Sequence, residues 1–322
     1  AIDTAVTEIK LTIYRVAEDS RVAEALISAA MNGKKITVLI EAKARFDESN
    51  NLKWAKKMQK AGIEVIFSKQ NIKVHSKIAL IKRKSSNGGI VNYAFLGTGN
   101  FNEKTASIYT DYALLTCDKI LTEELDQTLD FIFGKTKSIS LEHMLVARVN
   151  MLEEFMSLIE QEINNAKSNR EASITLKLNN LEDKEIIDKL YEAADAGVEI
   201  SLLVRGICTL VPRKNIVLKR LVDRFLEHNR VYLFHNDGNP SLYVGSADWM
   251  GRNLRRRIEV VFPVYSAAIK SNILTNLELQ WNDNTKSVRI DEQLNNIRIN
   301  ADGADEVRGQ LDYYNDLKAV NN

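Results

Sequence analysis

The stretch ALISAAMNGKKITVLIE, residues 25–41, decides the fold, because KLYEAADAGVEISLLVR at 189–205 repeats its pattern. Each copy has the apolar period of a helix, then a glycine that ends the helix (Gly33 or Gly197), then a short apolar strand. A strand precedes each helix as well. A strand, a helix and a buried strand in that order predict a parallel pair joined by a helical crossover. The sequence therefore predicts an α/β chain in which an internal duplication gives two halves one fold.

The strands that precede the two helices also correspond, IKLTIYRV at 9–16 to ITLKLNNL at 174–181. Later apolar runs extend both predicted sheets: GIEVIF (62–67), VHSKIALI (74–81) and YAFLGTGN (93–100) the first, RVYLF (230–234) and SLYVGSAD (241–248) the second. The polar stretch FGKTKSISLEH at 133–143 is the predicted joint. We therefore expect one domain over 1–138 and another over 139–322.

The composition supports two soluble domains. The 322 residues are 45% hydrophobic and 27% charged, which is typical of a globular chain and exceeds the usual size of one core. No apolar run is long enough to span a bilayer, and no leader sequence is visible. The start without Met suggests a fragment of a longer protein. Cys117 and Cys208 lie in apolar surroundings and are predicted to be buried thiols in a reducing compartment.

Basic residues gather locally although the net charge is only +1. They are dense over 43–84, 205–230 and 252–257, which predicts attraction of a polyanion if these segments converge. Lys56 and Lys57, in NLKWAKKMQK, fit a solvated helix face better than a site.

A small-residue turn precedes a carboxylate by 14 positions in both halves. Gly97-Thr98-Gly99-Asn100 is followed by Asp111, and Gly245-Ser246-Ala247-Asp248 by Glu259. Such a turn lets backbone N–H groups approach an anion, and a carboxylate one strand later can fix the tautomer of an imidazole. Asp111 near His75 and Glu259 near His228 are the candidate orienting carboxylates, and the spacing leaves open which carboxylate serves which ring.

The four histidines can be weighed one by one. Strand alternation places His75 on one face with Lys73 and Lys77, and like charges should keep its imidazole neutral and nucleophilic. Beside cations that neutralise phosphate oxygens, such a ring suits attack on phosphorus. His228, before a strand of the second half, is its expected partner. His143 and His235 have the contexts of linker and turn residues.

VHSK followed by GTGN resembles the H-x-K and G-[ST]-x-N elements of the phospholipase D superfamily. Within it, the chain closely resembles the C-terminal half of the bacterial polyphosphate kinases that work through a phosphohistidine. The matching stretches, in order, are IYRVAEDSRV, EAKARFDE, IKVHSK, GTGNFNEKTASIYTDYALLT, ITLKLNNL, LLVRGICTLVP, VDRFLEHNRVY and SADWMGRN. The resemblance covers essentially the whole chain and implies two tandem phospholipase D-like domains with the active site at their interface.

The resemblance also implies roles for individual residues. His75 is the implied phosphohistidine, and His228 is the implied second active-site histidine, a general acid or base that also contacts the nucleotide. Tyr109 and Arg205 are implied ATP contacts, and Arg15 and Arg45 stand where the family binds Mg²⁺ and phosphate. Arginine has no lone pair for a metal, so we interpret both as phosphate contacts and leave the metal ligands unassigned. Lys77 and Asn100 complete the predicted catalytic and phosphate-binding set.

Together these features predict reversible transfer of the ATP γ-phosphate to polyphosphate with Mg²⁺ as cofactor. The implied partners are ATP, ADP and polyphosphate without specific nucleic acid, and the full-length protein is expected to be a cytoplasmic homo-oligomer, at most peripheral to the inner membrane face. A fragment that lacks the family's N-terminal and helical domains is expected to turn over poorly.

Three features depart from the patterns. Lys82 stands where the wider superfamily has Asp, which favours a kinase over phosphodiester hydrolysis. The second half has no H-x-K, and the run between VP and LEH is shorter than is usual in the family. Two alternatives stay open: a phospholipase D-type nuclease or lipid transferase using the same histidines, and a catalytically idle polyanion-binding module.

Overall fold

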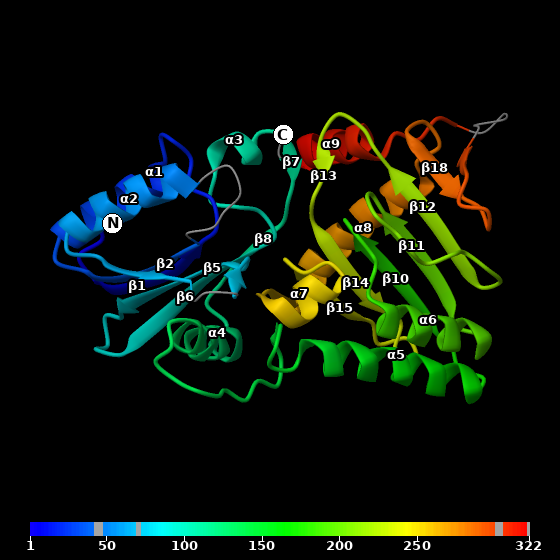
Figure 1. The fold of residues 1–322 in the computed structure, drawn as a ribbon, viewed down its shortest axis with the longest axis horizontal. Helices are drawn as coiled ribbons and strands as arrows, with labels where there is room; N and C mark the ends of the chain where they lie inside the picture. Colours follow the sequence, from blue (N-terminus) through cyan, green and yellow to red (C-terminus); the bar gives the residue numbers. More distant parts are fainter. Residues whose placement is uncertain (42–47, 69–71, 300–304, 321–322) are drawn as a thin grey trace. The chain divides into compact units, whose positions relative to one another are not determined.

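The computed structural model describes residues 1–41, 48–68, 72–299 and 305–320 (Figure 1). These residues form two compact units. The first unit is Ala1–Met151 with two later segments, Gly245–Ala247 and Arg252–Phe262, and the second unit is the rest. Ser246 and Glu259 therefore come from the second half of the sequence but belong to the first unit. The boundary expected between 138 and 139 stays a prediction.

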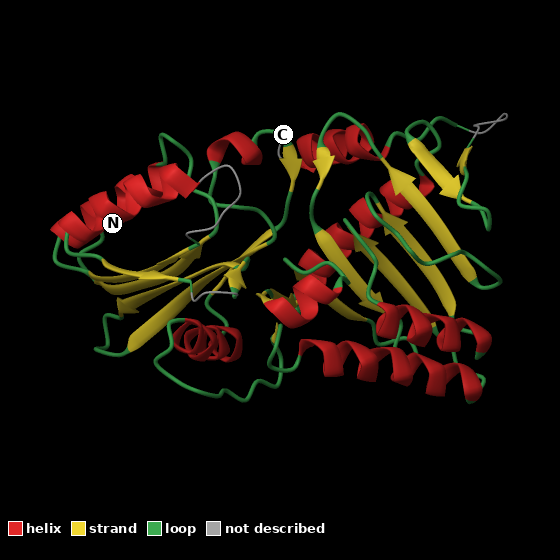
Figure 2. Ribbon diagram, viewed as in Figure 1, coloured by secondary structure: helices red, strands yellow, loops and turns green. Residues whose placement is uncertain are grey.

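The first unit contains a six-stranded sheet with the order β3-β2-β1-β5-β6-β8. Figure 2 shows α1 and α2 on one face of this sheet and α4 on the other. The strands are β1 (Val6–Ile13), β2 (Lys35–Ile40), β3 (Glu64–Phe67), β5 (Lys77–Lys84), β6 (Ile90–Gly97) and β8 (Ala113–Thr116). The helices are α1 (Arg21–Met31), α2 (Glu48–Lys60), α3 (Glu103–Ala106) and α4 (Lys119–Ile132). Shorter strands are β4 (Lys73–Val74), β7 (Tyr109–Thr110), β9 (Leu145–Val146), β16 (Arg257–Ile258) and β17 (Val260–Pro263).

The first crossover forms as the repeat predicts. Ser20 caps α1 by accepting a hydrogen bond from the N–H of Ala23, and Gly33, at a φ of 77°, takes the left-handed conformation beyond its end. The chain then enters β2, which pairs in parallel with β1. Apolar side chains of β1, β2, α1 and α2 form the core of the unit.

The second unit repeats this arrangement. Its strands follow the order β19-β18-β12-β11-β10-β14-β15, with β10 parallel to β11 and antiparallel to β14 as β1 is to β2 and β5. The strands are β10 (Ser173–Leu178), β11 (Glu199–Val204), β12 (Ile216–Leu221), β13 (Leu226–Glu227), β14 (Arg230–Phe234), β15 (Ser241–Gly245), β18 (Ser287–Ile290) and β19 (Asn296–Arg298). The helices are α5 (Met151–Lys167), α6 (Lys184–Asp195), α8 (Ala267–Asn282) and α9 (Gly309–Val320), while α7 (Gly251–Arg256) lies almost entirely in the first unit. The predicted duplication is confirmed.

Two local expectations are wrong. The strand expected over 74–81 is interrupted at His75 and Ser76, because the N–H groups of both residues donate to the carbonyl of Ile258. Cys117 is exposed and Cys208 half-buried, and both are free thiols. Cys117 follows β8, the last strand of its sheet, where even Leu115 is 76% exposed, so apolar neighbours in the sequence did not imply burial.

Candidate active site

His75 stands at the break between β4 and β5, and its backbone is fixed from two directions. The N–H of Val74 donates to the buried carboxylate of Glu41 at 3.0 Å, and the N–H of His75 donates to the carbonyl of Ile258 at 2.8 Å. Glu41 directly follows β2, so it lies at the carboxyl end of a parallel strand. The position of the imidazole is therefore set by the sheet and by β16.

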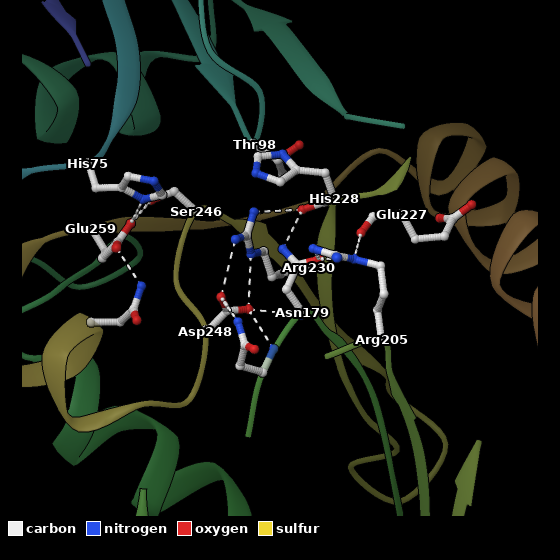
Figure 3. Close-up of polar contacts among 12 residues, drawn as sticks. His75, Thr98, Asn179, Arg205, Glu227, His228, Arg230, Ser246, Asp248 and Glu259 are labelled. Carbon is white, nitrogen blue, oxygen red and sulfur yellow. Dashed lines mark hydrogen bonds and ion pairs between the residues drawn. The ribbon is translucent and has the colours of Figure 1, made fainter. Parts of the chain in front are cut away.

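Glu259 orients the ring of His75 (Figure 3). Its Oε2 lies 2.9 Å from Nδ1 of His75 and accepts the hydroxyl of Ser246 at 2.6 Å, while its Oε1 accepts the amide of Asn253 at 2.6 Å. Lys77 Nζ is 3.0 Å from the same Nδ1 and donates to the carbonyl of His75 at 2.5 Å. An ionised carboxylate can only accept, so the bond to Glu259 requires a proton on Nδ1. The Lys77 ammonium then lies beside Nδ1 without donating to it, because its hydrogen bond goes to the carbonyl of His75. The lone pair of the ring is then on Nε2.

The electrostatic surroundings keep this ring neutral. The pKa of His75 is lowered to about 3, mainly by burial and further by the charge of Lys77, against an upward effect of Glu259. Burial alone would raise the pKa of Glu259, but the His75 ring, Lys77 and the Ser246 hydroxyl bring it below its ordinary value. The predicted neutral imidazole is confirmed, although burial contributes more than the like charges that the sequence suggested. A neutral ring with a carboxylate on Nδ1 is equipped to act as a nucleophile through Nε2.

This burial predicts a pH dependence of stability. Below pH 6.5 the unfolded chain protonates this histidine, whereas the folded chain does not until the pH approaches about 3. The free energy of unfolding should therefore fall as the pH drops through this window, and the contribution should be complete above pH 6.5. Urea unfolding at pH 7.5 and at pH 5 measures the loss. The free energy of unfolding of His75→Asn should fall less between the two pH values than that of the wild-type protein. An equal fall in both proteins would contradict a buried neutral ring.

The duplicated turns have the same geometry in both copies. The hydroxyl of Thr98 donates to Asp111 at 2.6 Å, as that of Ser246 does to Glu259. The N–H of Thr98 donates to the carbonyl of Tyr112, and that of Ser246 to the carbonyl of Val260, both at 3.0 Å. The shared spacing thus reflects shared structure. Glu259 serves the ring of His75, a pairing that the spacing left open, and the ring that Asp111 serves stays a prediction.

The other predicted site residues of the first unit are Arg15, Arg45, Asn100 and Tyr109. The ring of Tyr14 meets that of His75 edge to face at 4.7 Å, and the guanidinium of Arg15 lies 5.6 Å from the Tyr14 ring. Tyr14 thus contacts both the His75 ring and the Arg15 guanidinium. Tyr109 is half-buried, and the buried Oδ1 of Asn100 accepts no hydrogen bond from the described residues. Arg45 lies outside the described residues.

His228 is buried between β13 and β14 of the second unit, with two donors on its carbonyl oxygen. Arg230 Nη1 donates to this oxygen at 2.6 Å and Asn179 Nδ2 at 3.1 Å. Arg205, directly after β11, donates through Nε to the carbonyl of Glu227 at 2.7 Å and through Nη2 to Asn179 Oδ1 at 2.9 Å. The predicted residues His228 and Arg205 are therefore joined by Asn179 in one hydrogen-bonded group (Figure 3).

The second half does carry a counterpart of H-x-K. His228-Asn229-Arg230 leads into β14 as His75-Ser76-Lys77 leads into β5, and these strands occupy equivalent places beside β10 and β1. Arg230 donates to the carbonyl of His228 just as Lys77 donates to that of His75. A search of the sequence for H-x-R would have found this residue. Asn179 and Asp248 were also missed, because their role depends on contacts between distant segments.

The described residues contain no group of three or more His, Cys, Asp or Glu side chains that could hold a metal ion. Arg15, named from the family's magnesium site, can only donate. These residues do not fit a resident metal. Among the described helices, none has both the length and the apolar character needed to cross a membrane.

The fold is that of tandem phospholipase D-like domains, and each domain has a mixed sheet flanked by helices. The crystal structure of a phosphatidylserine synthase from Haemophilus influenzae Rd KW20 shows the same fold, with a TM-score of 0.59 at 10% identity over 86% of this chain and 81% of that one.

The sequence comparisons give the family. Models of polyphosphate kinase C-terminal domain 1 and polyphosphate kinase C-terminal domain 2 match residues 1–138 and 144–310. The chain belongs to the polyphosphate kinase family. A polyphosphate kinase of Yersinia pestis is 46% identical over 99% of this chain and 47% of its own length. The crystal structure of a polyphosphate kinase from Porphyromonas gingivalis has a TM-score of 0.93 at 44% identity, over 99% of this chain and 49% of that one. The chain thus spans about half the length of these relatives.

Proposed function

We propose that this chain carries the phosphoryl-transfer site of a polyphosphate kinase, with His75 as the covalent carrier. The observation that carries the proposal is the buried pair of His75 and Glu259, which leaves a neutral ring with its lone pair on Nε2. Membership of the polyphosphate kinase family supports ATP, ADP and polyphosphate as the substrates. Mg²⁺ is proposed to arrive with ATP as part of the substrate.

In the first step, Nε2 of His75 attacks the γ-phosphorus of ATP, the N–P bond forms, and the bond from phosphorus to the bridging oxygen breaks to release ADP. The ring becomes cationic, and the carboxylate of Glu259 stabilises it through the Nδ1 proton. Lys77, which lies beside the ring, and Arg15, which lies over the neighbouring Tyr14, neutralise charge on the transferred group.

In the second step, a terminal oxygen of polyphosphate attacks the phosphorus, and the N–P bond breaks to regenerate neutral His75. His228 is proposed as the general acid or base, and Asp111, Asn100 and Tyr109 as further contacts of the phosphates or nucleotide. The phosphohistidine is nearly as energetic as the phosphoanhydride, so the sequence runs in both directions. The cytoplasmic location, peripheral membrane association and oligomeric state implied by the resemblance stay predictions.

Labelling of the full-length protein with γ-labelled ATP tests the proposal. We expect an acid-labile, base-stable label on the peptide that contains VHSK. A phosphodiesterase using the same histidines, or an idle polyanion-binding module, gives no such label. Binding that weakens steeply with salt while the label is absent would favour the binding module.

Arg205 provides a test of nucleotide binding. We expect Arg205→Ala to weaken ATP binding by about 1.5–3 kcal/mol, the scale of charge-assisted hydrogen bonds. Arg205→Lys should retain only part of the ATP affinity that Arg205→Ala loses, because a lysine cannot reproduce the N–H groups that Arg205 donates to Asn179 and Glu227. Isothermal titration with ATP measures both effects.

The matched controls for Arg205 are Lys56→Ala and Lys57→Ala, which remove exposed charges from α2. Both should change ATP affinity little. Equal losses at Arg205 and at these lysines would indicate a diffuse basic field instead of a built site.

A further inference from the structure

Asp248 is the acceptor at the centre of a buried polar network in the second unit. Its side chain accepts the backbone N–H of Asn179 at 2.8 Å and of Asn180 at 3.2 Å, and the side-chain amide of Asn180 at 3.1 Å. Arg230 adds two donors, Nε and Nη2, each at 3.2 Å. Asp248 and Arg230 are only 4% and 3% exposed, so this is a buried ion pair whose charges are neutralised within the fold.

The same ion pair fixes the main chain of His228. The remaining guanidinium nitrogen of Arg230, Nη1, donates to the carbonyl of His228, and Asn179 donates to the same oxygen. All three guanidinium nitrogens of Arg230 are thus used inside the protein. Three of its five N–H groups are committed in this way and the side chain is only 3% exposed, which is typical of a structural guanidinium.

Asn179 extends the network to Arg205. Its Oδ1 accepts from Nε and Nη2 of Arg205, and its backbone N–H is held by Asp248 (Figure 3). One buried carboxylate therefore supports both the main chain of His228 and the guanidinium of Arg205.

The first unit has other residues at the positions that correspond to Arg230 and Asp248. Lys77 occupies the place of Arg230, and the aligned turn residue is Asn100 where the second half has Asp248. At these two positions the second half has Arg230 and Asp248, and the first half has Lys77 and Asn100. Arg230 can bind the carbonyl of His228 and Asp248 at once, whereas Lys77 lies against the ring of His75.

We propose that Asp248, Arg230 and Asn179 are positioning residues that hold His228 and Arg205 for phosphoryl transfer, and that Arg230 is not a phosphate contact. The proposal rests on the proposed function for the roles of His228 and Arg205. Their displacement slows transfer, because small misplacements of catalytic groups cost much of the rate.

The test uses the full-length protein with Asp248→Asn, Arg230→Lys and the double variant. Asp248→Asn leaves a buried guanidinium without its carboxylate, and we expect kcat to fall on the order of 10²-fold while KM for polyphosphate changes little. The double variant reproduces the Lys and Asn pair of the first half. It should fold and recover part of the lost rate, so that the two changes are not additive.

Asn179→Ala separates the two positioned groups. It removes a donor to His228 and the acceptor for Arg205, so we expect it to lower kcat and also to raise KM for ATP. Asp195→Asn is the control: it removes a carboxylate from an exposed ion pair with Arg213 in the same unit, and both constants should stay unchanged.

A structural readout separates this inference from the proposed function. Ring ¹⁵N spectra of histidine-labelled protein, with the His228 signal assigned by its loss in His228→Asn, should shift in Asp248→Asn and shift less in the double variant. Unchanged ring signals with unchanged kcat in Asp248→Asn would overturn the positioning role.

A rise in KM for polyphosphate in Arg230→Lys, with the His228 signal unmoved, would instead make Arg230 a phosphate contact. Absence of label on His75 in the wild-type protein would refute the proposed function, while the ring spectra would still decide the positioning role.

Discussion

Replacing His75 by alanine abolishes both polyphosphate synthesis and ATP regeneration in the full-length protein, since each direction passes through the same phosphohistidine. We expect a loss on the order of 10⁴-fold or more, because removal of a covalent nucleophile leaves only binding and charge stabilisation. Both directions are measured by coupled assay, and the label from γ-labelled ATP should disappear with them.

A second variant separates the nucleophile from the fold. His75→Asn places an amide donor near the position of Nδ1, where it can still bind Glu259, but offers no lone pair for phosphorus. It should unfold at nearly the wild-type urea concentration at pH 7.5 and remain inactive. Substantial activity in either direction, from either variant, would show that the phosphoryl group does not travel through His75.

The sequence predicted the fold well because its signals are local. Apolar period, glycine ends and the duplicated strand order require only neighbours along the chain, and β1, β2, β10 and β11 form as expected. The exposure of Cys117 was missed because it depends on which strand ends the sheet, and the repeat does not encode that.

The sequence predicted which residues form the site but not which of them contact one another. His75, Lys77 and Glu259 were all named from motif and spacing, and they meet within 3.0 Å of Nδ1. That Glu259 binds His75 depends on the return of Arg252–Phe262 to the first unit, a contact across 184 positions. Burial as the main cause of the low pKa of His75 likewise follows from tertiary packing. Arg230 was missed for a different reason, since its signal was present as H-x-R.

Glu259→Gln should slow phosphorylation of His75 by about 10²–10⁴-fold, the scale expected when the carboxylate that orients a catalytic imidazole is lost. The glutamine oxygen can still accept from Nδ1, but its neutral amide cannot stabilise the ring when attack on phosphorus makes it cationic. If its amide nitrogen instead faces Nδ1, the lone pair moves to Nδ1 and Nε2 carries the proton. Both arrangements weaken the nucleophile.

The surroundings of Glu259 favour a folded variant. Asn253 donates to Oε1 through its amide, and its own Oδ1 is buried without a hydrogen-bond partner among the described residues, so rotation of this amide can accept the new glutamine N–H. Ser246 can still donate to the retained oxygen. The loss should therefore be seen in rate, with a smaller loss in stability.

Glu124→Gln is the matched control for Glu259→Gln. Glu124 is a buried carboxylate of the first unit that accepts the backbone N–H groups of Glu142, His143 and Met144. The same chemical change there should lower the free energy of unfolding and leave the labelling rate unaltered, because its hydrogen bonds to described residues go to the backbone of 142–144 and not to His75. Rapid-quench labelling with γ-labelled ATP measures the rate of phosphohistidine formation in both variants. A wild-type rate of phosphohistidine formation in Glu259→Gln would mean that the negative charge of Glu259 does not contribute to the reaction. The reactivity of Nε2 would then be set by burial and Lys77 alone.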